Sequence, residues 1–195
     1  MATEIINERL LYPSYEIIGG EKIMAPAANL THSRIIMRLA LIIGNYLEEH
    51  QSGYVFADDV DVHFSDGTLY KPDLVVILKE NEKILNWSSN IYGAPDMVVE
   101  VLSKSTKKKD LTIKKDTYEA QGVREYWIVD PFSKSVSVYL LQDGKYIWAD
   151  EYAIFDEGDF KFMTEEEKTN VKTEVPVSIL EGLSIPLESI FKLSW

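Results

Sequence analysis

The chain has 195 residues and a formal net charge of −12 at pH 7. This length allows one domain whose core needs no disulfide or structural metal. The lack of cysteine excludes a thiolate zinc site and a cysteine nucleophile. The negative charge has the wrong sign for a protein that coats nucleic acid non-specifically. Because no run approaches the roughly 18 apolar residues of a membrane span, we expect a soluble, cytoplasmic protein.

The first half of the chain predicts one long helix followed by strands. Apolar residues at helical spacing predict a helix over residues 29–49, with Asn29 or Thr31 as its N-cap. Alternation of apolar and polar residues over 54–64 predicts a single strand. A glycine-containing turn then leads into a strand over residues 73–78. These strands would form a hairpin.

The middle of the chain continues with buried strands around a second helix. The apolar run 97–102 predicts a strand that is covered on both faces. Residues 103–106 lead into a second expected helix, which ends near Gln121 with Gly122 directly after its last turn. Residues 126–129 predict another buried strand, which ends at an Asp-Pro pair.

The C-terminal part predicts additions to this core. Residues 136–148 predict an outer hairpin, an acidic loop follows, and the apolar segment 179–187 is expected to pack back on the body. We therefore expect the α/β class, with a mixed sheet and helices packed on it. Residues 1–195 would form one domain, with a core of about 13–141 and C-terminal strands and an acidic loop over 142–195.

Two carboxylates lie in apolar strands. Glu100 stands inside the run 97–102, and Asp73 opens the run 74–78. Burying an unpaired carboxylate costs several kcal/mol, so each should be protonated, paired with a cation or bound to a metal. Adjacent strands lie about 4.8 Å apart, so the two acids can share one cation. Oxygen ligands suit Mg²⁺, which commonly takes one or two protein carboxylates. The sequence therefore predicts a Mg²⁺ site here, with Mn²⁺ as a substitute ion.

Lys114 is the candidate for a catalytic cation. It lies three residues after Leu111 and four before Tyr118, which predicts a place on the helix stripe that faces the sheet. There it could hold the nucleophile or stabilise charge in the transition state. Other interpretations stay open: an ion pair with Glu100 would explain both residues without catalysis, and Lys114 could extend to solvent. Asp73 could also simply cap a turn after the preceding proline.

Further charged residues are second-tier candidates. His32 would lie in the first turn of the first helix, where a lone histidine is more often hydrogen-bonded than a ligand. Asp110 could be a first-turn acid that favours the helix dipole. Asp61 alternates with apolar residues and would be solvated or would approach the metal. A lysine run could be a solvated helix face or a basic rim for nucleic acid. The rim residues would be Lys107, Lys108 and Lys109.

An ordered set of motifs carries a resemblance to a known family. The motifs are Pro72-Asp73, Ala94-Pro95-Asp96-Met97-Val98-Val99-Glu100-Val101-Leu102-Ser103, Lys114, Tyr118, Gly122-Val123 and Glu125-Tyr126-Trp127-Ile128-Val129-Asp130-Pro131. With these the chain resembles the Uma-type putative restriction endonucleases, a bacterial branch of the PD-(D/E)xK nuclease superfamily. The resemblance covers most of the chain and implies a restriction endonuclease-like core with extra C-terminal strands.

The resemblance also implies roles for single residues. Asp73 and Glu100 would bind Mg²⁺. Leu102 stands where the superfamily has its lysine, two residues after the acid. Related nucleases supply this lysine from a neighbouring helix, and Lys114 matches the lysine of this family's helix. Lys114 is therefore the expected third catalytic residue.

The function that we expect is metal-dependent hydrolysis of phosphodiester bonds in DNA by a homodimer. The alternative is a catalytically silent nuclease-fold module that binds nucleic acid or protein, since a fold does not determine a function. A small phosphorylated substrate is a third option, because nothing in the sequence reads bases.

Overall fold

A mixed six-stranded sheet forms the centre of the computed structural model, which describes residues 15–24, 29–57, 60–103 and 107–192. Its strand order is β11-β10-β9-β8-β6-β3, and of these neighbouring pairs β8 and β9 are parallel while the others are antiparallel. The strands are β3 (Gly53–Ala57), β6 (Leu74–Leu78), β8 (Met97–Val101), β9 (Glu125–Asp130), β10 (Ser135–Gln142) and β11 (Lys145–Ala153). The fold class is α/β, as predicted.

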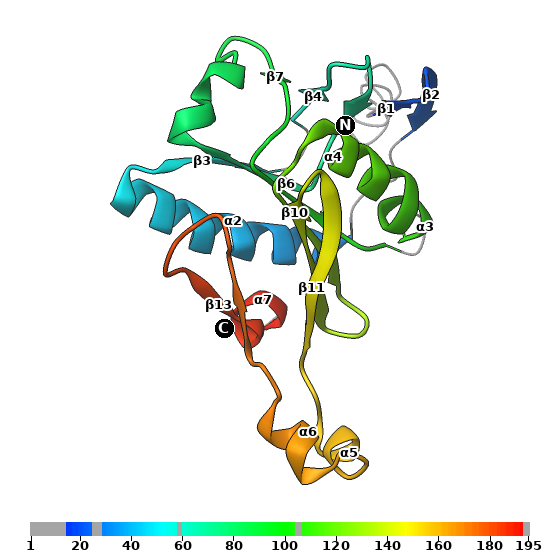
Figure 1. Cartoon of the computed structure of the whole chain (residues 1–195), viewed down its shortest axis with the longest axis vertical. Coiled ribbons are helices and arrows are strands. Elements are labelled where there is room, and N and C mark those ends of the chain that lie inside the picture. The colour runs from blue at the N-terminus through cyan, green and yellow to red at the C-terminus, as the bar shows by residue number, and fades with distance from the viewer. Residues whose placement is uncertain (1–14, 25–28, 58–59, 104–106, 193–195) are drawn as a thin grey trace, which may run out of the picture.

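One face of this sheet is covered by the long helix α2 (Leu30–His50), as Figure 1 shows. The side chain of Asn29 caps the helix by accepting a hydrogen bond from the backbone N–H of His32 at 3.0 Å. The helix buries its apolar stripe against Val76 and Val99 of the sheet. C-terminal elements pack against the same core, as predicted. They are β12 (Glu174–Pro176), β13 (Ser184–Pro186) and α7 (Leu187–Phe191).

The opposite face carries the second predicted helix and a second sheet. That helix consists of α3 (Lys107–Lys109), the π-helical segment η2 (Asp110–Lys114) and α4 (Lys115–Gln121), and it ends at Gly122 in the left-handed conformation. The second sheet has the order β2-β1-β5-β4-β7. Its strands are β1 (Tyr15–Ile18), β2 (Glu21–Met24), β4 (Val62–His63), β5 (Leu69–Tyr70) and β7 (Ile91–Tyr92). Buried tyrosines and Phe64 fill the space between these layers.

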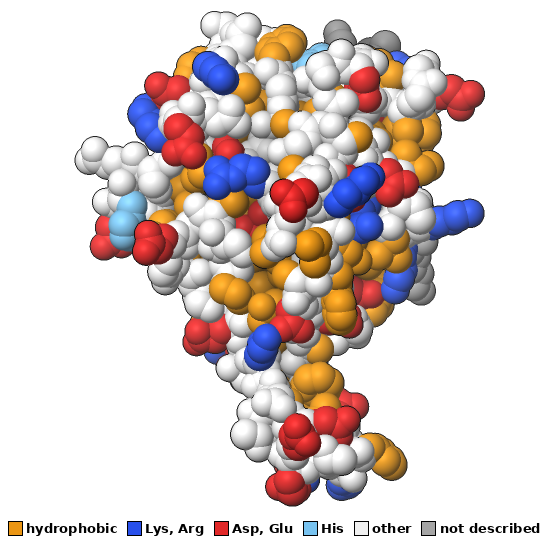
Figure 2. Space-filling model, viewed as in Figure 1, with side chains coloured by type: hydrophobic (Ala, Val, Ile, Leu, Met, Phe, Trp, Pro, Cys, Tyr) orange, Lys and Arg blue, Asp and Glu red, His pale blue; other side chains and the backbone are white. Residues whose placement is uncertain are grey.

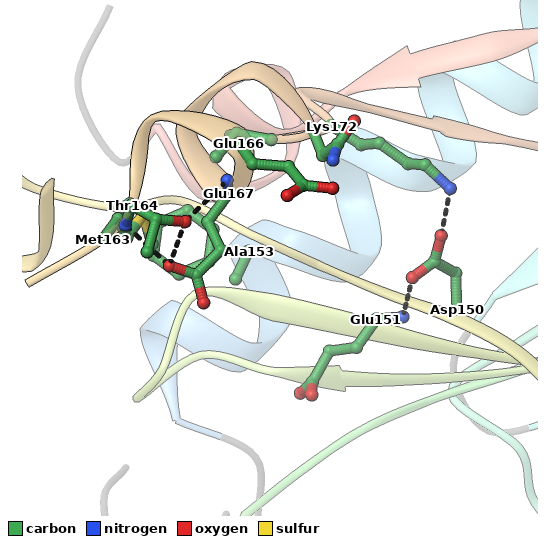
Figure 3. A pocket seen from close by; sticks show the side chains of 11 residues that line it. Asp150, Glu151, Ala153, Met163, Thr164, Glu166, Glu167 and Lys172 are labelled. Atoms are coloured by element: carbon green, nitrogen blue, oxygen red, sulfur yellow. Dashed lines mark hydrogen bonds and ion pairs between the residues drawn. The ribbon is translucent and has the colours of Figure 1, made fainter.

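Beyond β11 the chain forms an arm that projects from the body in Figure 1 and carries α5 (Glu157–Phe160) and α6 (Glu165–Thr169). Acidic side chains gather on this arm in Figure 2. A groove of about 860 Å³ lies between β11 and α6, as Figure 3 shows. Its lining includes Asp150, Phe155 and Glu166 but none of the predicted site residues.

Two predictions of local structure were wrong. Residues 54–64 do not form one strand: β3 ends at Ala57 and pairs with β6, whereas β4 belongs to the second sheet. The expected acidic loop contains α6, because Thr164 and Glu167 form a reciprocal capping box. Within the described residues, no helix is long and apolar enough to cross a membrane.

Between β6 and β7 the chain forms the 3₁₀ helix η1 (Lys79–Ile84).

Candidate active site

The strand register brings Asp73 and Glu100 together. Leu74 pairs with Val99 in the antiparallel β6–β8 ladder, so one step further Asp73 stands opposite Glu100. Val75 and Val98 both point into the core that contains Phe64 and the buried tyrosines. Side chains two residues apart on a strand share a face. Both acids therefore lie on the face of the central sheet that the second helix covers.

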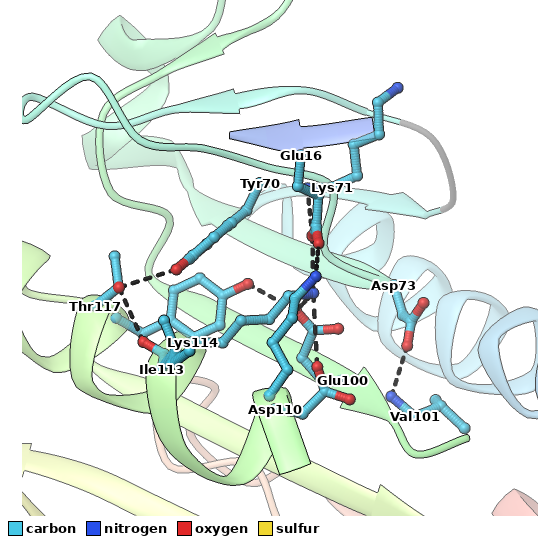
Figure 4. A network of polar contacts seen from close by, with 12 residues as sticks. Glu16, Tyr70, Lys71, Asp73, Glu100, Val101, Asp110, Ile113, Lys114 and Thr117 are labelled. Carbon is cyan, nitrogen blue, oxygen red and sulfur yellow. Dashed lines mark hydrogen bonds and ion pairs between the residues drawn. The ribbon is translucent and has the colours of Figure 1, made fainter. Parts of the chain in front are cut away.

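Glu100 is buried with 3% of its surface exposed, and two donors meet on one of its oxygens. The Lys114 ammonium and the Tyr118 hydroxyl each donate to Oε1 at 2.7 Å. Figure 4 shows the Lys114 side chain extending from its helix to Glu100. Among the residues that the structure describes, Oε2 of Glu100 has no hydrogen-bond partner.

Asp73 shows the same arrangement. Its Oδ2 accepts from the backbone N–H of Val101 at 2.6 Å and lies 3.1 Å from Nε2 of His32. Because a carboxylate only accepts, Nε2 is the protonated nitrogen of this imidazole. In the described part of the chain its other oxygen, Oδ1, makes no hydrogen bond. His32 is thus a direct neighbour of the predicted metal ligand.

Lys114 is buried with 4% of its surface exposed, which rules out the solvent-exposed alternative. Its burial fits part of the predicted stripe, because Asp110, Lys114 and Tyr118, spaced four residues apart, are all buried. A π-helical turn is wider than an α-helical one, so residues three apart no longer share a face. Leu111, which was expected on the same stripe, is 39% exposed.

Glu16 of β1 belongs to this cluster and was missed by the sequence argument. It is 3% exposed, and its Oε1 lies 2.9 Å from the Lys114 ammonium and accepts from the backbone N–H of Lys71 at 3.2 Å. Its other oxygen pairs with Lys109. The available signal was a carboxylate among the apolar residues Tyr15, Ile17 and Ile18.

The electrostatics of the site leave an excess of acid. Burial raises the pKa of Glu100 well above its usual value, and the Lys114 charge only partly opposes this. Burial also disfavours the Lys114 ammonium, yet Glu100, Glu16 and Asp110 together hold its pKa above the usual value. The carboxylates are Glu16, Asp73, Glu100 and Asp110, against the ammonium groups of Lys109 and Lys114.

A neutral Glu100 beside a charged Lys114 would gain little from their contact as an ion pair. Lys114 stays charged because three acids surround its ammonium: Glu100 at 2.7 Å, Glu16 at 2.9 Å and Asp110 at 3.7 Å. With Lys114 charged, the remaining acidic excess is what a bound cation would neutralise.

The other predicted residues are spread around this cluster. Lys109 belongs to the cluster because it pairs with Glu16. Lys107 instead pairs with Asp130 at 3.0 Å, and Lys108 is exposed. Asp61 lies outside the cluster, 3.0 Å from the Lys71 ammonium. No group of three or more acidic, His or Cys side chains among the described residues is arranged to hold a metal, so a site here would rest on two acids.

The comparison with family models decides the membership of the chain. Residues 8–159 match the model of Uma2, described as putative restriction endonuclease. The chain belongs to the Uma2 family. This confirms the resemblance, and the matched range includes Asp73, Glu100 and Lys114.

A solved structure has a similar fold. The chain is similar to the crystal structure of a putative nuclease belonging to DUF820 from Anabaena variabilis ATCC 29413, with a TM-score of 0.69 and 21% identity. The match covers 92% of this chain and 90% of that one. No curated protein matches the sequence. Uma2 membership and the shared fold support a nuclease function, and restriction endonuclease-like nucleases generally use divalent metals.

Proposed function

We propose that this Uma2 protein is an endonuclease that hydrolyses phosphodiester bonds of DNA with Mg²⁺ bound by Asp73 and Glu100. The observation that carries the proposal is the pattern of hydrogen bonds on these two acids. Each lies on the same sheet face, each receives its donors on one oxygen, and a buried ammonium group lies beside them. This arrangement leaves oxygens for a ligand.

The donor set fits a hard divalent cation. Mg²⁺ prefers oxygen ligands, is commonly bound through one or two carboxylates, and keeps other positions for water and substrate phosphate. Oδ1 of Asp73 and Oε2 of Glu100 would supply such ligands, and Mn²⁺ could replace Mg²⁺. The acidic excess of the cluster gives a further reason, since it would be relieved by two positive charges.

A bound divalent ion can polarise a phosphoryl oxygen and lower the pKa of a bound water. The chain's own residues would do the rest. An ammonium group has three N–H donors, and Lys114 uses two on Glu100 and Glu16, since Asp110 at 3.7 Å is beyond hydrogen-bond distance. The third would stabilise negative charge that develops on a phosphate. The exposed Lys108 would contact the nucleic-acid backbone.

One observation favours the alternative of a catalytically silent module. Lys114 already pairs with Glu100 and Glu16, and such a buried ion pair can be purely structural. The alternatives differ in their need for metal, because a structural ion pair binds no divalent cation.

A homodimer in the cytoplasm belongs to the same proposal. Two copies would place two sites on the two strands of a duplex, and two-fold symmetry is the commonest oligomeric arrangement. Light scattering across micromolar concentrations tests this. A mass near the 22.3 kDa of one chain would contradict it.

The test of activity uses supercoiled plasmid, single-stranded DNA and RNA, each with Mg²⁺, Mn²⁺ or a chelator. We expect cleavage of DNA that the chelator abolishes, and no cleavage by Glu100→Gln prepared in parallel. The variant controls for contaminating nucleases. Equal cleavage by both proteins, or none of any substrate with either metal, would contradict the proposal.

A further inference from the structure

The hydroxyl of Tyr118 takes a hydrogen-bonding position that a metal could otherwise use. A carboxylate offers about four lone-pair sites, two on each oxygen. On Glu100, the Lys114 ammonium and the Tyr118 hydroxyl both donate to Oε1 at 2.7 Å, so the two sites of this oxygen are filled. The oxygen that remains is Oε2.

Tyr118 is fixed in this position by its surroundings. Its side chain is fully buried, and its ring packs against Tyr70 and Tyr126 with centroids 5.5 and 5.1 Å away. A phenol is protonated at neutral pH, so its hydroxyl donates to Oε1 of Glu100 across the 2.7 Å contact. The phenol therefore has little freedom to turn away from Glu100.

His32 contacts one oxygen of Asp73, as Tyr118 contacts one oxygen of Glu100. The N–H of Val101 and the imidazole of His32 both meet Oδ2, which fills that oxygen. Each of the two acids is thus left with a single oxygen for a metal. Bidentate binding by either carboxylate would require the loss of one of these contacts.

Resting on the proposed metal site, we propose that Tyr118 is a specificity-determining residue that restricts Glu100 to one metal-facing oxygen and so favours Mg²⁺ over Ca²⁺. Mg²⁺ takes six ligands in a strict octahedron and keeps several waters, which suits two carboxylates with one oxygen each. Ca²⁺ takes six to eight oxygen ligands and gains from bidentate carboxylates. Blocking the second oxygen therefore penalises the larger ion.

Titration calorimetry with Mg²⁺, Mn²⁺ and Ca²⁺ at one neutral pH tests this without any measurement of activity. Loss of a hydrogen-bond partner of a ligand typically changes metal affinity about 10- to 100-fold. We expect Tyr118→Phe to bind Mg²⁺ about tenfold more weakly while Ca²⁺ affinity holds or rises, so that the ratio of the two affinities shifts toward Ca²⁺. The control is Tyr70→Phe, which removes another buried hydroxyl of the same cluster, one that contacts Thr117 at 3.0 Å instead. Its ratio should match the parent protein.

The outcomes separate the two proposals. An equal loss of affinity for both ions in Tyr118→Phe would show a merely structural role and overturn this inference alone. A parent protein that binds no divalent cation would overturn the metal site itself. If Tyr118→Phe does not fold, His32→Ala asks the same question at Asp73 and should shift the ratio in the same direction. An unchanged ratio in that variant would count against the inference.

Discussion

Two regions of the central sheet bury carboxylates, and they bond them differently. Asp96, directly before β8, uses both oxygens: Oδ2 accepts from Leu78 N–H at 2.9 Å and Asn81 at 3.1 Å, and Oδ1 lies 3.3 Å from Arg124. Asp96 therefore joins β6, η1 and the start of β9, and it has the environment of a structural acid.

Glu125, at the start of β9, follows the same pattern as Asp96. Its Oε1 accepts from the indole N–H of Trp127 at 2.7 Å, and its Oε2 accepts from the backbone N–H of Ile179 at 2.9 Å. Among the described residues, Glu100 and Asp73 each receive their donors on a single oxygen. The comparison teaches that burial alone does not mark a candidate ligand, whereas an acid with one oxygen left over does.

The largest expected effect separates the cations of the two regions. Lys114→Ala should lower single-turnover cleavage at saturating DNA about 10²- to 10³-fold, because one donor at developing charge is worth roughly that much. Arg124→Ala, which removes the cation beside Asp96, should leave turnover unchanged. Equal losses in both variants would mean that the two regions do not differ in function.

Two controls accompany the Lys114 variant. Removing this ammonium leaves the buried Glu100 without a counter-charge and Glu16 with Lys109 alone, which costs about 3–5 kcal/mol of stability, so activity is compared well below the variant's melting temperature. Lys108→Ala, at an exposed position, should weaken DNA binding and its salt dependence without changing turnover. A turnover loss in Lys108→Ala that matches Lys114→Ala would make the lysine run a generic basic patch.

The same substitution at the two kinds of acid should have different effects on stability. In Glu100→Gln the amide oxygen can still accept from Lys114 and Tyr118, and the NH₂ group takes the position of Oε2, which accepts no hydrogen bond from the described residues. Glu125→Gln instead turns an NH₂ group toward one of two buried donors, which costs about 1–3 kcal/mol. Urea unfolding should show a loss for Glu125→Gln and none for Glu100→Gln. A reversed order would contradict the distinction.

A smaller effect concerns acid pH. Burial opposes the charge of Glu16, but Lys114 and Lys109 hold its pKa below the usual value. The stability from this contact is therefore fully present above the ordinary glutamate pKa, about 4.5, and is lost as the pH falls through the lower folded value. Glu16→Gln should lose less stability than the parent protein between neutral and acid pH. Parallel urea curves at several pH values test this, and identical losses would exclude Glu16 as a source.

Much of the fold could be predicted because strong local patterns define it. The apolar runs of β6 and β8 and the amphipathic stripe of α2 are long enough to fix element type. The prediction of a single strand over residues 54–64 failed because the alternation continues from β3 into β4, although the two strands pair in different sheets. Alternation records the exposure of side chains and carries no information on pairing partners.

The residues of the candidate site were also predicted only in part. Asp73 and Glu100 stood out as acids in apolar strands, and Lys114 as a lysine on an inward face. The π-helical turn was not visible, because a period of 3.6 residues was assumed, and this misplaced Leu111. Glu16 was missed because its burial depends on Lys114 and Lys109, which lie far away in the sequence.

The most direct test of the central claim is calorimetric titration of Mn²⁺ into the parent protein, Glu100→Gln, Asp73→Asn and Glu125→Gln. If Asp73 and Glu100 hold the metal, the parent protein and a folded Glu125→Gln should bind Mn²⁺, while the other two variants should not. Unchanged Mn²⁺ affinity in Glu100→Gln and Asp73→Asn, with melting curves that show both variants folded, would contradict the account.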